Sequence, residues 1–116
     1  MLFRSMLQRC QDVNAAYGTQ AQVFTDLSTM IRETKPDLVI VVTPEHLHAQ
    51  HIITALQAGC DVATEKPLCV SMEQSRAILD AERSTGKRIF MGFNYRHVPL
   101  LTRLKQLLNQ IGRAHV

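Results

Sequence analysis

The sequence contains no tryptophan, only three cysteines, and no apolar run long enough to cross a membrane. A membrane-spanning helix needs about 20 consecutive apolar residues, so no such helix is predicted. The segment Met1–Leu7 also lacks the apolar core and small-residue cleavage site of a signal peptide. Cys10, Cys60 and Cys69 have no metal-ligand spacing, and their odd number argues against a disulfide framework. We therefore expect reduced thiols, as in a cytoplasmic protein.

Glycine is also scarce, and its spacing excludes one common turn. A dinucleotide-binding fold normally opens with a strand and a Gly-x-Gly-x-x-Gly turn, which brings the pyrophosphate to a helix N-terminus. The glycines lie too far apart to form that turn: Gly18, Gly59, Gly86, Gly92 and Gly112. We therefore expect no phosphate-binding loop in this chain.

Length and charge set two further limits. A chain of 116 residues, of which 46% are hydrophobic and 20% charged, is typical of one small soluble domain at most. The formal net charge of +3 is too small to indicate binding to nucleic acid or to a membrane surface.

A strand–helix–strand pattern occupies the middle of the chain. Residues 38–42 are Leu-Val-Ile-Val-Val, which predicts a parallel strand buried on both faces. Thr43 and Pro44 follow as expected N-cap and first residue of a helix that stops at Gly59. A second short strand is expected over residues 61–64.

Polar residues follow each of these strands. Thr43 comes after the first strand, Glu65 and Lys66 come after the second, and His48 lies in the helix between them. In open α/β sheets, ligands bind outside the carboxyl ends of the strands. We therefore expect these four residues to share one edge of the sheet.

The remaining chain continues the alternation of helices and strands, which predicts an α/β fold with a parallel sheet flanked by helices. The expected elements are a helix over 6–17, a short strand at Val23-Phe24, a helix capped by Asp26 or Ser28 and ending at Thr34, a helix from Ser71 to Gly86, a strand over 88–93, and a helix over 99–110 whose leucines form a buried stripe.

Three motifs occur in a fixed order: Thr43-Pro44-x-x-x-His48, then Glu65-Lys66-Pro67, then Gly92-Phe-Asn-Tyr-Arg-x-x-Pro99. Together they resemble the glucose–fructose oxidoreductase, inositol dehydrogenase and rhizopine-catabolism family (Gfo/Idh/MocA), whose members are NAD(P)-dependent dehydrogenases of sugars and polyols. Each motif alone is weak, but the ordered set covers most of the chain.

The resemblance implies a partial Rossmann-like domain over residues 6–110, without the first strands and the phosphate loop, and a C-terminal substrate domain outside the chain. It also implies NAD or NADP as cofactor, a sugar or polyol as substrate, and a homo-oligomeric full-length protein. Segments 1–5 and 111–116 match peptides that common sequencing adapters encode, so we expect both to be library scars.

The resemblance also implies roles for single residues. Lys66 is the expected catalytic residue, holding the substrate hydroxyl beside the nicotinamide and assisting proton transfer. The alternative is that Lys66 is an ordinary solvated charge on the surface. The residues expected at the cofactor are Thr43, Pro44, His48, Glu65, Lys66, Asn94 and Arg96.

Simpler roles remain open for several of these residues. Helix capping alone would explain Thr43 and Pro44, and His48 can be an exposed helical histidine. Glu65 can pair only with its neighbour on the surface, and Arg96 can pair with a surface acid. His48 and His51 share a helical face but have no third ligand near in sequence, so we expect no metal site.

Two other functions fit the pattern less well. One is a non-catalytic relative that binds a nucleotide or sugar as a sensor. The other is a receiver-like signalling domain, which needs a phosphoacceptor aspartate and an acidic pair. Asp26 is the nearest acceptor, but no acidic pair precedes it.

Overall fold

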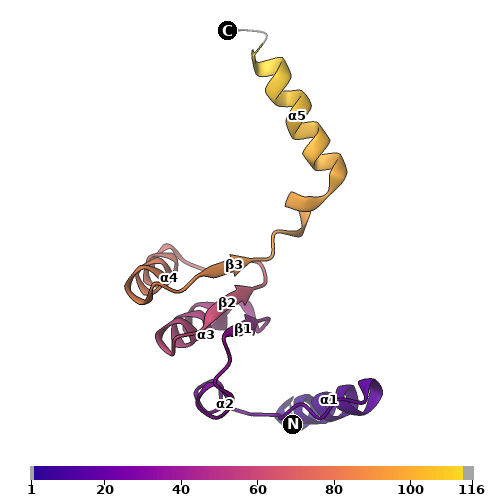
Figure 1. The fold of residues 1–116 in the computed structure, drawn as a ribbon, viewed down its shortest axis with the longest axis vertical. Coiled ribbons are helices and arrows are strands. Elements are labelled where there is room, and N and C mark those ends of the chain that lie inside the picture. The colour runs from indigo at the N-terminus through magenta and orange to yellow at the C-terminus, as the bar shows by residue number, and fades with distance from the viewer. Residues whose placement is uncertain (1, 114–116) are drawn as a thin grey trace. The chain divides into compact units, whose positions relative to one another are not determined.

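Residues 2–113 are described by a computed structural model, in which the chain divides into two units, Met1–Lys35 and Pro36–Val116. The termini of the expected scar segments, residue 1 and residues 114–116, lie outside the described residues. The elements are α1 (Leu2–Tyr17) and α2 (Leu27–Thr34) in the first unit, and β1 (Leu38–Val41), α3 (Glu45–Gln57), β2 (Asp61–Thr64), α4 (Met72–Thr85), β3 (Ile89–Met91), the 3-10 helix η1 (Asn94–His97) and α5 (Pro99–Arg113) in the second (Figure 1).

The second unit is built on a three-stranded sheet in the order β1-β2-β3. Both strand pairs are parallel, with Val39 opposite Val62 and Thr64 opposite Met91. Helix α3 packs against β1 and β2, and α4 packs against α3. The predicted α/β fold with a parallel sheet is confirmed.

The core lies between α3, α4 and one face of the sheet. Its fully buried side chains come from both helices and from β2 and the turn before it: Ile52, Leu56, Ile78, His48, Val62 and Cys60. Burial raises the pKa of the Cys60 thiol, because a thiolate loses its hydration inside an apolar core.

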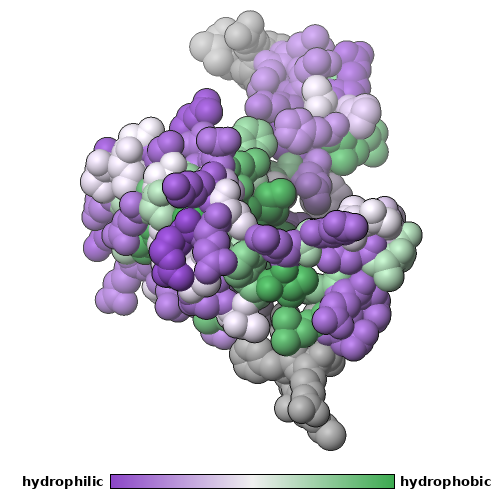
Figure 2. Space-filling view, turned by 60° about the horizontal axis from the view of Figure 1, so that its bottom comes forward, coloured by the Kyte–Doolittle hydropathy of each residue, from purple (hydrophilic) through white to green (hydrophobic). Residues whose placement is uncertain are grey.

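The expectation that residues 38–42 are buried on both faces is wrong. Val39 and Val41 are buried, whereas Leu38 and Ile40 are exposed and Val42 lies beyond the end of β1. Successive side chains of a strand point to opposite faces of the sheet. Within the described part of the second unit, helices pack on one face only. Figure 2 shows that hydrophobic side chains reach the surface of the molecule.

The ends of α2 and α4 that the sequence predicts from capping residues are confirmed. Asp26 caps α2 by accepting a hydrogen bond from the Thr29 backbone N–H at 2.7 Å, and this bond lowers the pKa of Asp26. Ser71 caps α4 by accepting one from the Gln74 N–H at 3.2 Å. Gly86 ends α4 with a φ of 67°, which favours glycine.

Two other sequence expectations are wrong. Val23-Phe24 does not form a strand, because a strand needs a hydrogen-bonding neighbour and the described part of the first unit contains only helices. The leucine stripe of α5 is exposed, because η1 is the element that α5 contacts within the described residues. In the part of the chain that the structure describes, we find no helix long and apolar enough to span a membrane.

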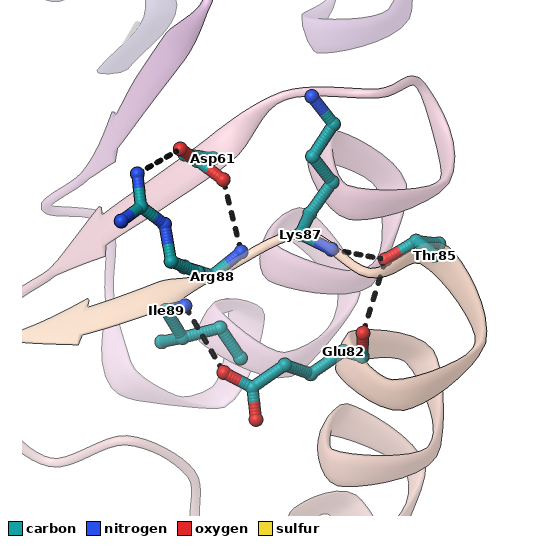
Figure 3. A network of polar contacts seen from close by, with 6 residues as sticks. All are labelled: Asp61, Glu82, Thr85, Lys87, Arg88 and Ile89. Atoms are coloured by element: carbon teal, nitrogen blue, oxygen red, sulfur yellow. Dashed lines mark hydrogen bonds and ion pairs between the residues drawn. The ribbon is translucent and has the colours of Figure 1, made fainter.

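A polar network fixes the start of β3 against β2 (Figure 3). Asp61 accepts hydrogen bonds from the Arg88 backbone N–H at 2.9 Å and from its guanidinium at 3.2 Å. Glu82 accepts one from the Ile89 N–H at 3.2 Å. The bonds from Arg88 lower the pKa of Asp61. This network lies at the amino ends of the strands, away from the edge where ligands are expected.

Candidate functional site

The carboxyl ends of the strands meet at one edge of the sheet, and backbone hydrogen bonds continue beyond the strands. The Glu65 N–H donates to the Val41 carbonyl at 3.0 Å, and the Gly92 N–H donates to the Thr64 carbonyl at 2.9 Å. The segments that follow β1, β2 and β3 are therefore held next to one another. This edge is where open α/β sheets bind ligands.

His48 connects two of these segments. Its side chain is 1% exposed, so the alternative of an exposed helical histidine is wrong. Its Nε2 lies 2.7 Å from the Thr43 carbonyl oxygen, and its Nδ1 lies 2.7 Å from the Pro67 carbonyl oxygen. The ring thus joins the segment after β1 to the segment after β2.

Thr43 does not cap α3 as expected. The N-cap position is occupied by Pro44, which makes no side-chain hydrogen bond, and the helix begins at Glu45. The Thr43 hydroxyl instead lies 3.2 Å from Nδ1 of His51. A hydroxyl engaged with His51 is not directed to the first N–H groups of the helix. The sequence indicates His51 only as a possible metal ligand, although its spacing from His48 places both residues on one helical face.

Glu65 and Lys66 follow β2 at the same edge. The Lys66 backbone N–H donates to the Glu65 carboxylate at 2.6 Å, so Glu65 folds back over its own segment. The Lys66 side chain is exposed, and within residues 7–111 no hydrogen bond or ion pair holds its ammonium. The peptide bond between Lys66 and Pro67 is cis. The Lys66 side chain is thus accessible for a ligand.

Gly92 was not among the predicted site residues, yet it lies beside Glu65. A Cβ atom on Gly92 would be 3.7 Å from the Glu65 carboxylate and 3.5 Å from the Thr64 carbonyl oxygen. Its position at the start of a Gly-Phe-Asn motif after the last strand was the available signal.

Asn94 and Arg96 belong to η1, just beyond β3. Both are exposed, and the Arg96 guanidinium lies 5.2 Å from the centre of the Phe93 ring, a cation–π contact. The structure brings Asn94 close to Gly92, whereas no hydrogen bond or ion pair within residues 7–111 joins Arg96 to His48 or Thr43. A hollow of about 500 Å³ is lined by Phe93, Tyr95, Arg96, Leu101, Thr102 and Lys105.

The edge therefore combines an accessible lysine, a carboxylate, and a buried histidine that holds two loops together. In the described residues, no three His, Cys, Asp or Glu side chains converge on a point where a metal would bind. These groups can bind and orient a polar organic molecule and move a proton to or from it.

Comparisons with known proteins identify the family of the chain. Residues 1–93 match the family profile described as "Oxidoreductase family, NAD-binding Rossmann fold" (Gfo/Idh/MocA). The chain is 38% identical over 92 residues to D-glucoside 3-dehydrogenase of Escherichia coli, covering 79% of this chain and 26% of that protein. It is 30% identical over 112 residues to inositol 2-dehydrogenase of Paracoccus denitrificans, covering 96% of this chain and 32% of that protein.

A solved structure is also similar. The WlbA dehydrogenase from Bordetella pertussis, in complex with NADH and UDP-GlcNAcA, superimposes with a TM-score of 0.79 at 31% identity, over 86% of this chain and 28% of that one. The chain thus spans about a quarter to a third of the length of these relatives. A receiver-like domain is excluded, since the chain belongs to the Gfo/Idh/MocA family of oxidoreductases with an NAD-binding Rossmann fold.

Proposed function

We propose that this chain, over residues 6–110, is part of the nucleotide-binding domain of an NAD(P)-dependent dehydrogenase of a sugar or polyol, and that Lys66 is its catalytic residue. The observation that carries the proposal is the accessible Lys66 side chain at the carboxyl end of β2, beside Glu65, in a chain of this family. The glucoside and inositol dehydrogenases among its relatives support a sugar or polyol as the substrate.

A nicotinamide cofactor, when bound, exchanges a hydride with the carbon that carries the substrate hydroxyl. Lys66 holds that hydroxyl by a hydrogen bond. In its amine form it accepts the hydroxyl proton during oxidation, and in its ammonium form it returns the proton in the reverse direction. Glu65 lies beside Lys66 and accepts hydrogen bonds from a ribose hydroxyl.

Thr43, Pro44, Asn94 and Arg96 complete the proposed contacts with the nicotinamide half of the cofactor. Thr43 and Pro44 offer backbone groups at the N-terminus of α3, where the helix dipole favours negative charge. The Arg96 guanidinium supplies charge-assisted hydrogen bonds to amide or phosphate oxygens. His48 serves this site through the loops that it holds, since both of its ring nitrogens face backbone carbonyls.

We further propose a cytoplasmic, homo-oligomeric full-length protein. Free Cys10, Cys60 and Cys69 fit a reducing compartment. A non-catalytic sensor of the same family is the second candidate, and the Glu65-Lys66-Pro67 motif argues against it.

Substitution of Lys66 in the longer dehydrogenase that contains this chain tests the proposal. We expect Lys66→Ala to reduce kcat by at least about 100-fold, the lower range for loss of a general acid–base group. NADH affinity, measured by fluorescence titration, should change little. Lys66→Arg is the matched control, because it keeps the charge but does not readily give up a proton. Near-normal turnover of Lys66→Ala, or of the arginine variant, contradicts the catalytic role and favours the sensor.

A further inference from the structure

His48 is enclosed by two loops that come from different strands. One loop contains Thr43 and follows β1; the other contains Pro67 and follows β2. Each ring nitrogen of His48 lies 2.7 Å from a carbonyl oxygen, one in each loop. With 1% of the side chain exposed, water cannot replace either contact.

The two contacts set a requirement on the ring. A carbonyl oxygen only accepts hydrogen bonds, so each nitrogen of His48 must donate. A neutral imidazole has one N–H and one lone pair, and therefore satisfies one carbonyl while its lone pair faces the other. An imidazolium carries an N–H on both nitrogens and satisfies Thr43 and Pro67 together.

We propose that His48 is a positioning residue whose doubly protonated ring clamps the Lys66–Pro67 segment to the Thr43 loop, and so sets the place of the Lys66 side chain. The assignment of Lys66 as the residue served by this clamp rests on the proposed function. Lys66 directly precedes the clamped Pro67, so the bond to the Pro67 carbonyl fixes the backbone from which the Lys66 side chain extends.

The titratable and charged groups near the clamp lie on α4, on α3 and on the segment after β2. On α4, which packs against α3, they are Glu73, Arg76, Asp80, Glu82 and Arg83. On α3 they are Glu45 and His46, both exposed, and His51, which contacts the Thr43 hydroxyl. On the segment after β2 they are Glu65 and Lys66. Within residues 7–111 no carboxylate pairs with the His48 ring, and its polar partners are the carbonyl oxygens of Thr43 and Pro67.

Deprotonation therefore has a structural consequence. Loss of one ring proton replaces one of two hydrogen bonds by contact between a lone pair and a carbonyl oxygen, which is unfavourable in a buried site. One loop is then released from the other. Because an error of about 1 Å in the position of a catalytic group can cost about 100-fold in rate, this release reaches the chemistry at Lys66.

Nuclear magnetic resonance of the 116-residue chain tests the clamp without any enzyme assay. The ¹⁵N shifts of the two His48 ring nitrogens distinguish the imidazolium from either neutral tautomer. We expect both nitrogens to carry protons at the acid end of a pH titration. As the second proton leaves, the amide signals of Thr43, Lys66 and Leu68 should shift with the same midpoint.

A matched variant separates the two histidines of α3. His51→Gln removes the other nearby titrating ring and should leave the His48 midpoint and the coupled loop signals in place. A His48 ring that stays a neutral tautomer throughout the titration overturns the proposal, as do loop signals that follow His51 instead. Both readings come from chains with an intact His48, so they do not depend on whether a His48 variant folds.

Kinetics of the longer dehydrogenase complete the test. His48→Gln keeps only one donor group, and we expect it to lower kcat by about 100-fold while the KM for the cofactor changes little. In the wild-type enzyme, kcat should fall as the pH rises, with the midpoint seen for His48 by magnetic resonance. The His48→Gln variant should lack this fall in kcat. An unchanged kcat and pH profile overturn the positioning role. If Lys66→Ala stays active while His48 still titrates with the loops, the proposed function fails and the clamp stands.

Discussion

Val39 and Ile40 are consecutive residues of β1 with opposite surroundings: Val39 is 5% exposed and Ile40 is 67% exposed. The difference arises because α3 packs on the face of the sheet that carries Val39. Two chemically similar side chains, adjacent in sequence, therefore contribute very differently to stability.

We expect Val39→Asp to prevent cooperative folding of this chain, because an unpaired buried charge costs on the order of several kcal/mol. Ile40→Asp is the matched control and should fold with nearly unchanged stability and improved solubility. Urea unfolding followed by circular dichroism measures both variants. Loss of folding in Ile40→Asp would mean that its face of the sheet is covered in solution.

Asp61 should make stability depend on pH. Its pKa is lowered in the folded chain by hydrogen bonds from Arg88, so its contribution is fully present above the pKa of the unfolded chain. The contribution is lost as the pH falls through the lower, folded-state pKa. We therefore expect Asp61→Asn to be less stable than the parent at pH 7, with a deficit that shrinks in acid. Thermal melts at a series of pH values provide the measurement, and a deficit independent of pH would contradict it.

Cys60 should be the slowest of the three thiols to react. Burial raises its pKa, and the thiolate is the nucleophile. Cys10 is exposed and should react first with iodoacetamide at neutral pH. Mass spectrometry of the separate peptides gives each rate, with the urea-unfolded chain as control, where the three rates should converge. Equal rates in the folded chain would show that the core opens readily.

The chain by itself should bind NAD or NADP weakly or not at all. Pyrophosphate recognition needs backbone N–H groups from a glycine turn at a helix N-terminus. The glycines of this sequence lie too far apart to form such a turn. In the proposed function, Glu65, Lys66 and Arg96 contact only the nicotinamide half of the cofactor. Calorimetric titration with each dinucleotide measures this, and micromolar binding of either one would refute it.

Local features were predictable from the sequence because they depend on neighbours a few residues away. The cap at Asp26, the cap at Ser71 and the glycine end of α4 at Gly86 each involve one turn of backbone. The alternation of strands and helices likewise predicted the parallel sheet, and with it the common edge that holds Thr43, Glu65 and Lys66.

Burial and side-chain partners were decided by the tertiary structure. An apolar strand or helix face is buried only if another element packs on it, so the exposure of Ile40 and of the α5 leucines could not be read from their own segments. His48 bonds to a carbonyl 19 residues away, and His51 takes the Thr43 hydroxyl expected to cap α3. Sequence periodicity reports what a segment can bury, whereas the packing of distant segments determines what it does bury and which atoms it meets.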